Sequence, residues 1–262
     1  MCQQLTEYLN VNNLFPKWQS AYRQYHSTET ALVRLANDLL LSVDQGKMTI
    51  LVSLDQSAAF DVCDIVILTE RLRYSYGING TALKLLTSYL SNRSVRVKVG
   101  NSDLSEFCET KYGVPQGSTL GPLLYILYTG PLINFLATKG IGCQCYADDL
   151  QLYFVFEAFT PNVVFNIEQC LKEIQLWMQI NFLKLNPDKT EMFLIGSKNN
   201  SFIKNKSTIT VNIDGDNVEN IHCMKSLGVL FDNVLSMESF VSSKCKCMGL
   251  YLTRMSKVRK FL

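Results

Sequence analysis

Two adjacent aspartates, Asp148 and Asp149, constrain the fold of this chain more than any other feature, because they interrupt an apolar stretch. Residues 142–156 have the pattern of two short strands, which predicts a hairpin with the pair at its tip. Charged side chains between buried strands are costly unless something compensates them, and a divalent cation is the usual partner of clustered carboxylates. An Asp-Asp pair alone is also common in solvated turns, so the rest of the chain has to decide.

A third aspartate, Asp55, ends an apolar run at residues 50–54 that is typical of a buried strand. Carboxylate oxygens that leave positions open for water and phosphate suit Mg²⁺. Two such ions a few ångströms apart activate a primer 3′-hydroxyl and stabilise a leaving pyrophosphate. In-line phosphoryl transfer needs mainly positioning and charge neutralisation, which a site of this kind supplies.

The other periodic segments alternate irregularly between strands and helices, which predicts an α+β fold. Helices are expected at residues 28–45 (with Thr28 as N-cap), 61–74, 81–91, 119–137, 163–182 and 238–260. Strands are expected at residues 48–54, 93–99, 191–196, 208–213 and 226–231, with a hairpin turn at Asp214-Gly215. In residues 93–99 three valines alternate with Arg96 and Lys98, which predicts a half-buried strand with a basic outer face.

Composition limits the class of protein. The chain of 262 residues is 47% hydrophobic and 18% charged, enough apolar material for a full core. Its net charge of only +2 means that any basic groove depends on where the charges lie. No apolar run has the length of a membrane span and no signal core is present, so we expect an intracellular protein. Nine irregularly spaced cysteines, with Cys-x-Cys at 143/145 and 245/247, favour reduced and mostly buried thiols over disulfides or zinc.

Four ordered segments resemble motifs A to D of reverse transcriptases from non-LTR (LINE-type) retrotransposons. They are residues 54–61 (Leu-Asp-Gln-Ser-Ala-Ala-Phe-Asp), 113–122 (Gly-Val-Pro-Gln-Gly-Ser-Thr-Leu-Gly-Pro), 146–149 (Tyr-Ala-Asp-Asp) and 185–191 (Leu-Asn-Pro-Asp-Lys-Thr-Glu). Residues 19–32 resemble the element that precedes motif A, and residues 226–229 resemble the primer grip. The resemblance covers nearly the whole chain, and the joint order and spacing argue against chance.

This resemblance implies a right-hand polymerase palm, an antiparallel sheet with helices packed on one face, together with partial fingers and a truncated thumb. The expected divisions are residues 1–50 (partial fingers), 51–75 (palm with motif A), 76–112 (an insertion with a basic hairpin), 113–235 (palm with motifs B, C, D and the primer grip) and 236–262 (start of the thumb).

The resemblance also implies roles for the acidic residues and one lysine. Asp55 and Asp148 would ligate two Mg²⁺ ions, or Mn²⁺ in their place, with Asp149 as a supporting ligand. Lys189 matches the position proposed as general acid toward pyrophosphate, and an ordinary exposed loop lysine is the equal alternative. Asp61 is interpreted as the cap of the following helix.

Nucleotide contacts are implied for Phe60, Gln116 and Gly117. Phe60 falls where the family places a steric gate against a ribonucleotide, and packing of an aromatic ring in the core is the alternative. Gln116 and Gly117 lie in a turn at a helix start, which the family uses to contact the incoming nucleotide and template. Glycines at 113 and 117 would allow close approach of the backbone to a ligand.

The partners implied are an RNA template, a DNA primer or RNA–DNA hybrid, and deoxynucleoside triphosphates, with no prediction for protein partners. Arg23, Arg96 and Lys98 are candidates for contact with the nucleic acid, held through phosphates and shape. Six basic residues fit a thumb helix along the duplex, or equally a solvated helix face. They are Lys244, Lys246, Arg254, Lys257, Arg259 and Lys260.

The chain departs from the family pattern in several places. An earlier fingers segment and most of the thumb are expected to be missing. Asp64-Ile65 stands where the family commonly has Asp-His, and residues 129–132 (Thr-Gly-Pro-Leu) replace an Asn-Asp-Leu ending. A catalytically incomplete nucleic-acid-binding remnant is therefore the alternative function. A group II intron or retron polymerase shares the palm, but motifs A and B are closer to the LINE type. A nuclear site of action follows only from the family's habit of priming at chromosomal breaks.

Overall fold

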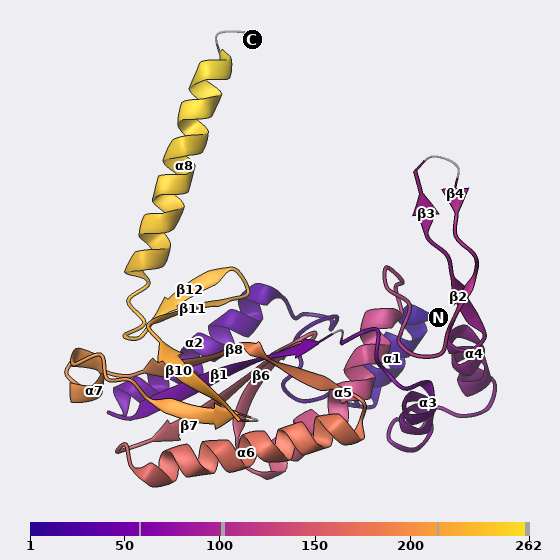
Figure 1. The fold of residues 1–262 in the computed structure, drawn as a ribbon, viewed down its shortest axis with the longest axis horizontal. Helices are drawn as coiled ribbons and strands as arrows, with labels where there is room; N and C mark the ends of the chain where they lie inside the picture. Colours follow the sequence, from indigo (N-terminus) through magenta and orange to yellow (C-terminus); the bar gives the residue numbers. More distant parts are fainter. Residues whose placement is uncertain (58, 101–102, 214, 260–262) are drawn as a thin grey trace.

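A six-stranded sheet forms the centre of the molecule, in the order β6-β7-β1-β8-β10-β9 (Figure 1). The computed structural model describes residues 1–57, 59–100, 103–213 and 215–259, so predictions on Ala58, Asp214 and Lys260 fall outside the described residues. The strands are β1 (Met48–Ser57), β6 (Gly142–Tyr146), β7 (Asp149–Phe156), β8 (Lys184–Ile195), β9 (Thr210–Ile213) and β10 (Asp216–Ile221). Within the described residues, neighbouring strands of this sheet pair in antiparallel fashion, except that β8 and β10 are parallel. β1 lies between β7 and β8, so Asp55 ends an interior strand.

Helices cover both faces of this sheet. On one face lie α5 (Gly121–Thr138) and α6 (Pro161–Ile180), and on the other lie α2 (Thr28–Asp44) and the hairpin of β11 (Cys223–Ser226) and β12 (Val229–Asp232). Side chains alternate along β1, so Ile50, Val52 and Leu54 join the α5 cluster while Leu51 joins the α2 cluster. The prediction of helices on one face was therefore incomplete, because β1 is apolar on both faces and needs two covers.

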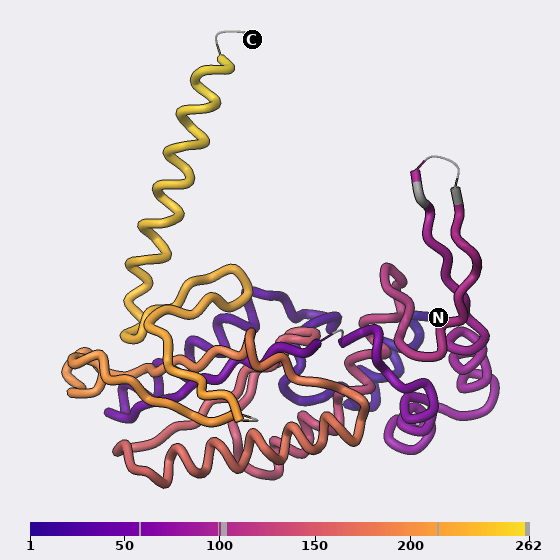
Figure 2. The backbone as a smooth tube through the Cα atoms, viewed as in Figure 1, coloured from indigo at the N-terminus to yellow at the C-terminus, as the bar shows by residue number. Residues whose placement is uncertain are grey.

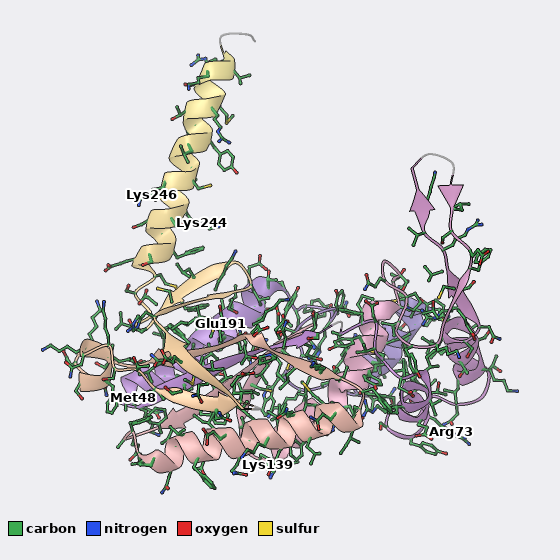
Figure 3. The ribbon with its side chains drawn as sticks, in the orientation of Figure 1. Met48, Arg73, Lys139, Glu191, Lys244 and Lys246 are labelled. Atoms are coloured by element: carbon green, nitrogen blue, oxygen red, sulfur yellow. The ribbon has the colours of Figure 1, made fainter. Side chains whose placement is uncertain are left out.

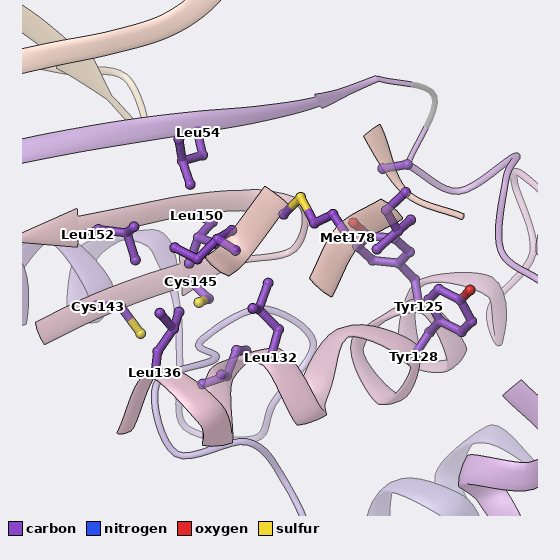
Figure 4. Close-up of a cluster of buried hydrophobic side chains, with 14 of the residues drawn as sticks. Leu54, Tyr125, Tyr128, Leu132, Leu136, Cys143, Cys145, Leu150, Leu152 and Met178 are labelled. Atoms are coloured by element: carbon purple, nitrogen blue, oxygen red, sulfur yellow. The ribbon is translucent and has the colours of Figure 1, made fainter. Parts of the chain in front are cut away.

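The core beneath the sheet is built around α5, an almost entirely buried helix. Figure 4 shows Leu132 and Leu136 of α5 beneath Leu150 and Leu152 of β7, with the ring of Tyr125 farther along the same helix. Full burial of a side chain of this size stabilises the fold by about 1.5–3 kcal/mol. The sheet above α5 is therefore a rigid support for residues at its strand ends.

Pro131 lies inside α5 at one of the departures from the family pattern. A proline cannot donate to the carbonyl four residues earlier, which here belongs to Leu127. The buried hydroxyl of Tyr76 donates to that carbonyl at 2.9 Å. Gly130 makes room for this hydroxyl, because a Cβ at that position would come within 2.4 Å of it. The Tyr76 hydroxyl thus compensates for the hydrogen bond that Pro131 cannot make.

One end of the molecule consists of helices and a projecting ribbon (Figure 1). The helices are α1 (Cys2–Val11), α3 (Ile65–Tyr74) and α4 (Gly80–Leu90), and the ribbon strands are β2 (Arg93–Val95), β3 (Lys98–Val99), β4 (Asp103–Leu104) and β5 (Cys108–Thr110). The ribbon extends away from the sheet (Figures 1 and 2). Val95 and Val97 are 55% and 62% exposed, so the prediction of a half-buried strand was wrong. Alternating valines identify a face of a strand, but no described element packs on it.

Helix α8 (Glu238–Val258) projects from the opposite end of the molecule (Figures 1 and 2). It lies wholly in the described part of the chain, and none of its residues is buried. Its joint with β12 is organised by Asp232, whose carboxylate accepts the backbone N–H of Val234, Ser236 and Met237 at 3.2, 2.9 and 2.8 Å. Leu235 and Met237 have left-handed backbones, with φ of 55° and 60°.

Most predicted segments are confirmed, with shifted ends. The N-cap of α2 is Ser27, not Thr28, because the Ser27 hydroxyl and Thr30 form a reciprocal capping box. The strand expected at residues 191–196 begins earlier, at Lys184, and residues 226–231 divide between β11 and β12. A four-residue helix, α7 (Ser201–Lys204), was not predicted.

All nine cysteines lie in the described part of the chain, and none is in a disulfide. Four are buried, but four others are exposed, so the prediction of mostly buried thiols holds for about half of them. The exposed ones are Cys108, Cys223, Cys245 and Cys247. Among the described residues, no helix combines the length and apolarity that crossing a membrane requires.

Candidate active site

Asp55 stands at the end of β1 beside an irregularity in β8. Ser53 pairs with Glu191 and Asp55 with Asn186, so four residues of β8 bulge out opposite Leu54. Lys189 belongs to this bulge, and its Nζ lies 3.4 Å from the Asp55 carboxylate. Its side chain is 67% exposed, against 33% for Asp55. The structure therefore brings together two predicted catalytic residues that are 134 positions apart in sequence (189 − 55).

Asp148 and Asp149 occupy the tip of the hairpin between β6 and β7, as predicted. Tyr146 pairs with Asp149, so Ala147 and Asp148 form a two-residue turn. Leu54 of β1 pairs with Leu150 of β7. Asp55 follows Leu54 and Asp149 precedes Leu150, so both aspartates lie directly beyond this pair at the same end of the two strands. The pKa of Asp149 is raised by loss of hydration and then by the negative charges of Asp148 and Asp55. The three carboxylates thus share one electrostatic environment at one edge of the sheet.

The carboxylate edge faces the side of the sheet that carries α2 and the β11–β12 hairpin. On β7, the Tyr153 hydroxyl donates to Asp38 of α2 at 2.7 Å, and the Gln151 amide donates to Ser226 of β11 at 2.9 Å. Asp149 precedes Gln151 by two residues and therefore points to the same face. The segment predicted as primer grip is consequently attached to the strand that starts with Asp149.

The side chains of two glutamines, the half-buried Gln56 and the buried Gln19, hold the turn, and neither contact was predicted from the sequence. The Gln56 amide donates to the Asp148 carbonyl at 3.2 Å and accepts from the Tyr125 hydroxyl at 2.5 Å. Burial raises the pKa of Tyr125 well above its ordinary value, so its hydroxyl remains a donor. The Gln19 amide bonds both backbone groups of Ala147. Only the position of Gln56 directly after Asp55 hinted at this role.

Motifs A and B are joined through their backbones. The N–H of Gly113 donates to Cys63, and the N–H of Val114 donates to Phe60, both at 2.8 Å. A Cβ on Gly113 would come within 2.6 Å of the Asp61 carbonyl, so glycine is required there. The close backbone approach that Gly113 makes in this structure is to motif A. Gly117 has a φ of 73° with open space around it.

Asp61 and Gln116 contact each other, which corrects one prediction. The Gln116 amide donates to both carboxylate oxygens of Asp61 at 2.8 Å. Asp61 does not cap the next helix, because that helix starts later and Asp64 accepts from the Ile67 N–H at 2.9 Å. The exposed Gln116 side chain is thus oriented by motif A.

Phe60 is half-buried and its ring packs on Tyr125, with centroids 4.5 Å apart. One side of the ring is therefore occupied by the core, in agreement with the packing interpretation. The rest of the ring retains exposed surface. Packing and a gating role are compatible for this residue.

The predicted nucleic-acid contacts lie apart from the carboxylates. Arg96 stacks on Phe107 at 4.7 Å within the projecting ribbon, where Lys98 is also exposed. Arg23 stacks on Phe15 at 5.5 Å and is half-buried. Lys244 and Lys246 lie on the lower half of α8 (Figure 3). None of these cations forms an ion pair with Asp55, Asp148 or Asp149 among the described residues.

The donor atoms at the acidic edge suit a divalent metal ion. Clustered carboxylate oxygens are the ligands that Mg²⁺ and Mn²⁺ prefer. The pKa of Asp149 is raised first by loss of hydration and then by repulsion from Asp148 and Asp55, and a cation would relieve the repulsion. Among the described residues, however, no group of three acidic, histidine or cysteine side chains is close enough to enclose an ion. The carboxylate oxygens are therefore suitable ligands for Mg²⁺ or Mn²⁺, but in this conformation they do not enclose an ion.

Two solved telomerase structures are similar to this chain in fold. The apo telomerase from Candida tropicalis truncated from its C-terminal domain matches with a TM-score of 0.57 and 17% identity over 90% of this chain and 44% of that chain. The telomerase from Candida albicans in complex with a fragment of telomeric RNA gives a TM-score of 0.58 and 14% identity, covering 90% of this chain and 37% of that chain. These similarities confirm the α+β right-hand polymerase fold.

Curated relatives are polymerases of mobile elements. The probable RNA-directed DNA polymerase from transposon BS of Drosophila melanogaster is 29% identical over 72% of this chain and 21% of the relative. The RNA-directed DNA polymerase from mobile element jockey of Drosophila funebris is 25% identical over 94% of this chain and 26% of the relative. The chain thus spans about a quarter of the length of these relatives, and the prediction of a non-LTR retrotransposon domain is confirmed. Because the family model for reverse transcriptase (RNA-dependent DNA polymerase) matches residues 1–251, this chain belongs to the reverse transcriptase family.

Proposed function

We propose that this chain performs RNA-directed DNA synthesis, adding deoxynucleotides to a primer 3′-hydroxyl by phosphoryl transfer with two Mg²⁺ ions, or Mn²⁺ in their place. The observation that carries the proposal is the meeting of Asp55, Asp148 and Asp149 at one sheet edge, with Lys189 3.4 Å from Asp55. Bound ions lower the pKa of the hydroxyl nucleophile and neutralise charge on the leaving pyrophosphate. The chain's own contribution is to fix the carboxylates that hold them.

Lys189 is proposed to donate a proton to a pyrophosphate oxygen as the bond to the α-phosphorus breaks. Its contact with Asp55 places the ammonium group next to the carboxylate site. The bulge of β8 leaves the side chain largely exposed, so it can turn from Asp55 toward a phosphate. A general acid has to be within hydrogen-bonding reach of the atom it protonates, and the proximity of Lys189 to Asp55 supports this role.

Gln116, Gly117 and Phe60 are proposed to bind the incoming nucleotide. Asp61 holds the Gln116 amide, which leaves the amide oxygen to accept from a ligand. The open space around Gly117 permits a ligand to approach its backbone. Phe60 is proposed to press on the sugar with its exposed side, supported on the other side by Tyr125.

The proposed partners are an RNA template, a DNA primer and deoxynucleoside triphosphates. Arg23, Arg96 and Lys98 and the basic residues of α8 are proposed to contact phosphates. Arg96, Lys98 and the described basic residues of α8 are exposed, and Arg23 is half-buried. The family membership also supports the proposed division into partial fingers, palm and thumb start, with boundaries at residues 50, 75, 112 and 235. A nuclear site of action is proposed from the same family membership.

The test is primer extension by the purified chain on an RNA template with a DNA primer, in Mg²⁺ and in Mn²⁺. We expect extension by the wild type and none by Asp55→Asn or Asp148→Asn. Binding of the hybrid, measured by fluorescence anisotropy, serves as the control and should be similar in all three proteins. Hybrid binding without any extension by folded wild-type protein would contradict the proposal and identify a non-catalytic remnant.

A further inference from the structure

Gln19 is a buried polar residue that the reaction does not use directly. Its exposed fraction is only 1%. Its amide nitrogen donates to the Ala147 carbonyl at 3.1 Å, and its amide oxygen accepts the N–H of Ala147 at 3.0 Å and of Ala21 at 2.9 Å. A buried amide with this many partners is costly to replace by an apolar group, because backbone groups would then be left unpaired.

The backbone around Gln19 is itself attached to the catalytic hairpin. Cys145 donates to the Trp18 carbonyl and Ser20 donates to the Cys145 carbonyl, both at 3.0 Å. These bonds form an isolated parallel bridge along β6. The bridge ends where the turn begins, and the Gln19 side chain extends the pairing past the last strand residue to Ala147. A segment 128 residues earlier in sequence thus continues the sheet into the turn.

The turn needs such support because of its conformation. Ala147 has a φ of 57°, a left-handed backbone that costs an alanine about 1–2 kcal/mol. Strained residues of this kind persist only where the surroundings hold them. Gln19 binds both backbone groups of Ala147, and Gln56 binds the carbonyl of Asp148. A change of backbone angle at Ala147 would redirect the side chain of Asp148, the next residue.

We propose that Gln19 is a positioning residue for the metal site, which holds Ala147 in its left-handed conformation and thereby orients Asp148. The inference rests on the proposed function for its link to catalysis. Gln19 acts through the backbone and touches neither substrate nor ion. Groups that orient metal ligands typically change metal affinity or activity by about 10–100-fold when they are removed.

The test compares Gln19→Met with Gln144→Met. Gln144 is a matched control, because its amide is also buried and binds the same segment through Ser20 at 2.9 Å, but it does not contact the turn. We expect Gln19→Met to weaken Mn²⁺ binding by about 10-fold or more, measured from the electron paramagnetic resonance signal of free Mn²⁺. Gln144→Met should stay within about twofold of the wild type. Gln19→Met should also lower kcat with little change in the KM for template and primer.

A rescue experiment separates positioning from general stability. Glycine adopts left-handed angles without strain, so Ala147→Gly should restore several-fold of the Mn²⁺ affinity in the Gln19→Met background. A purely structural defect would not be repaired by glycine, which adds flexibility. Hydrogen exchange of residues 142–153 should increase in Gln19→Met and not in Gln144→Met.

Mn²⁺ affinity within twofold of the wild type in Gln19→Met, with unchanged hairpin exchange, would overturn the inference. If Gln19→Met does not fold, Gln19→Glu keeps the acceptor and removes the donor, and the same two readouts apply to it. Metal binding and exchange are measured without nucleic acid. A wild type that binds Mn²⁺ but extends no primer would therefore refute the proposed function while still testing Gln19.

Discussion

The carboxylate edge of the sheet and helix α8 are built in opposite ways. At the edge, the turn that carries Asp148 is fixed by side chains from other parts of the chain, the buried Gln19 and the half-buried Gln56. Along α8 no described residue is buried, and Leu250 and Leu252 are 63% and 66% exposed. The difference teaches that contacts within the chain fix the positions of the proposed catalytic residues. The side chains of α8, a proposed nucleic-acid surface, have no such contacts to fix them.

The largest expected effect is at the carboxylate edge. Asp148→Asn should lower primer extension by at least about 1,000-fold, because the loss of a proposed metal ligand would remove several kcal/mol of charge stabilisation. The thermal unfolding midpoint should not fall, since one source of repulsion on Asp149 is also removed. Activity above about a tenth of the wild-type rate would place the metal site elsewhere.

A matched pair of leucines tests the contrast in stability. Leu152 of β7 is fully buried, and Leu152→Ala should lower the free energy of unfolding by about 2–5 kcal/mol. Leu252 of α8 is 66% exposed, and Leu252→Ala should change it by less than about 0.5 kcal/mol. Urea unfolding followed by circular dichroism measures both. Equal losses would mean that α8 packs on the rest of the chain in solution.

Lys189 lies between the two extremes, since it is exposed but contacts the edge. Lys189→Met should lower kcat by about 100-fold if it is the general acid, with little change in stability. Lys198→Met, an exposed lysine after the end of β8, is the control and should keep full activity. Single-turnover rates separate the chemical step from product release, and an unchanged rate would return Lys189 to the status of a loop residue.

The success of sequence reasoning follows the same contrast. The strand before Asp55 and the hairpin at Asp148 were predictable, because they are local patterns of apolar residues around charge. The contacts of Gln19 with Ala147 and of Gln116 with Asp61 were not, since they join residues 128 and 55 positions apart. Asp61 was misassigned as a cap because two aspartates, three residues apart, both precede α3, and only the helix start distinguishes them. The roles of Lys189 and Phe60 came from the family resemblance alone.

The effect of the Asp149 charge on stability should depend on pH. The pKa of Asp149 is raised above its ordinary value of 3.8, so ionisation disfavours the folded state. Its stabilising contribution is complete below pH 3.8 and is lost as pH rises through the folded pKa. Asp149→Asn should therefore have a higher unfolding midpoint than the wild type at neutral pH and not at acidic pH. Added Mg²⁺ should reduce the difference, and thermal scans across this range measure it.

The smallest effect is expected on α8. Lys246→Ala should weaken hybrid binding only a few-fold and reduce the slope of log affinity against log salt concentration by about 1. Lys139, which pairs with Glu173 at 3.0 Å on α6 and lies on the far side of the molecule from α8 in Figure 3, provides a control for charge loss. An unchanged slope in Lys246→Ala would show that this part of α8 does not meet phosphates.

The joint at Asp232 gives α8 the properties of a lever. Helix α8 has 21 residues and is therefore about 30 Å long at 1.5 Å per residue. A rotation of only about 10° at its base moves the far end by about 5 Å, close to one helical pitch. The angle is set by four hydrogen bonds to one carboxylate, three from backbone N–H groups and one from the Ser236 hydroxyl. The contacts of one carboxylate at the base of α8 thus decide where the far end of a long helix lies, because a small rotation at the base becomes a large displacement at the tip.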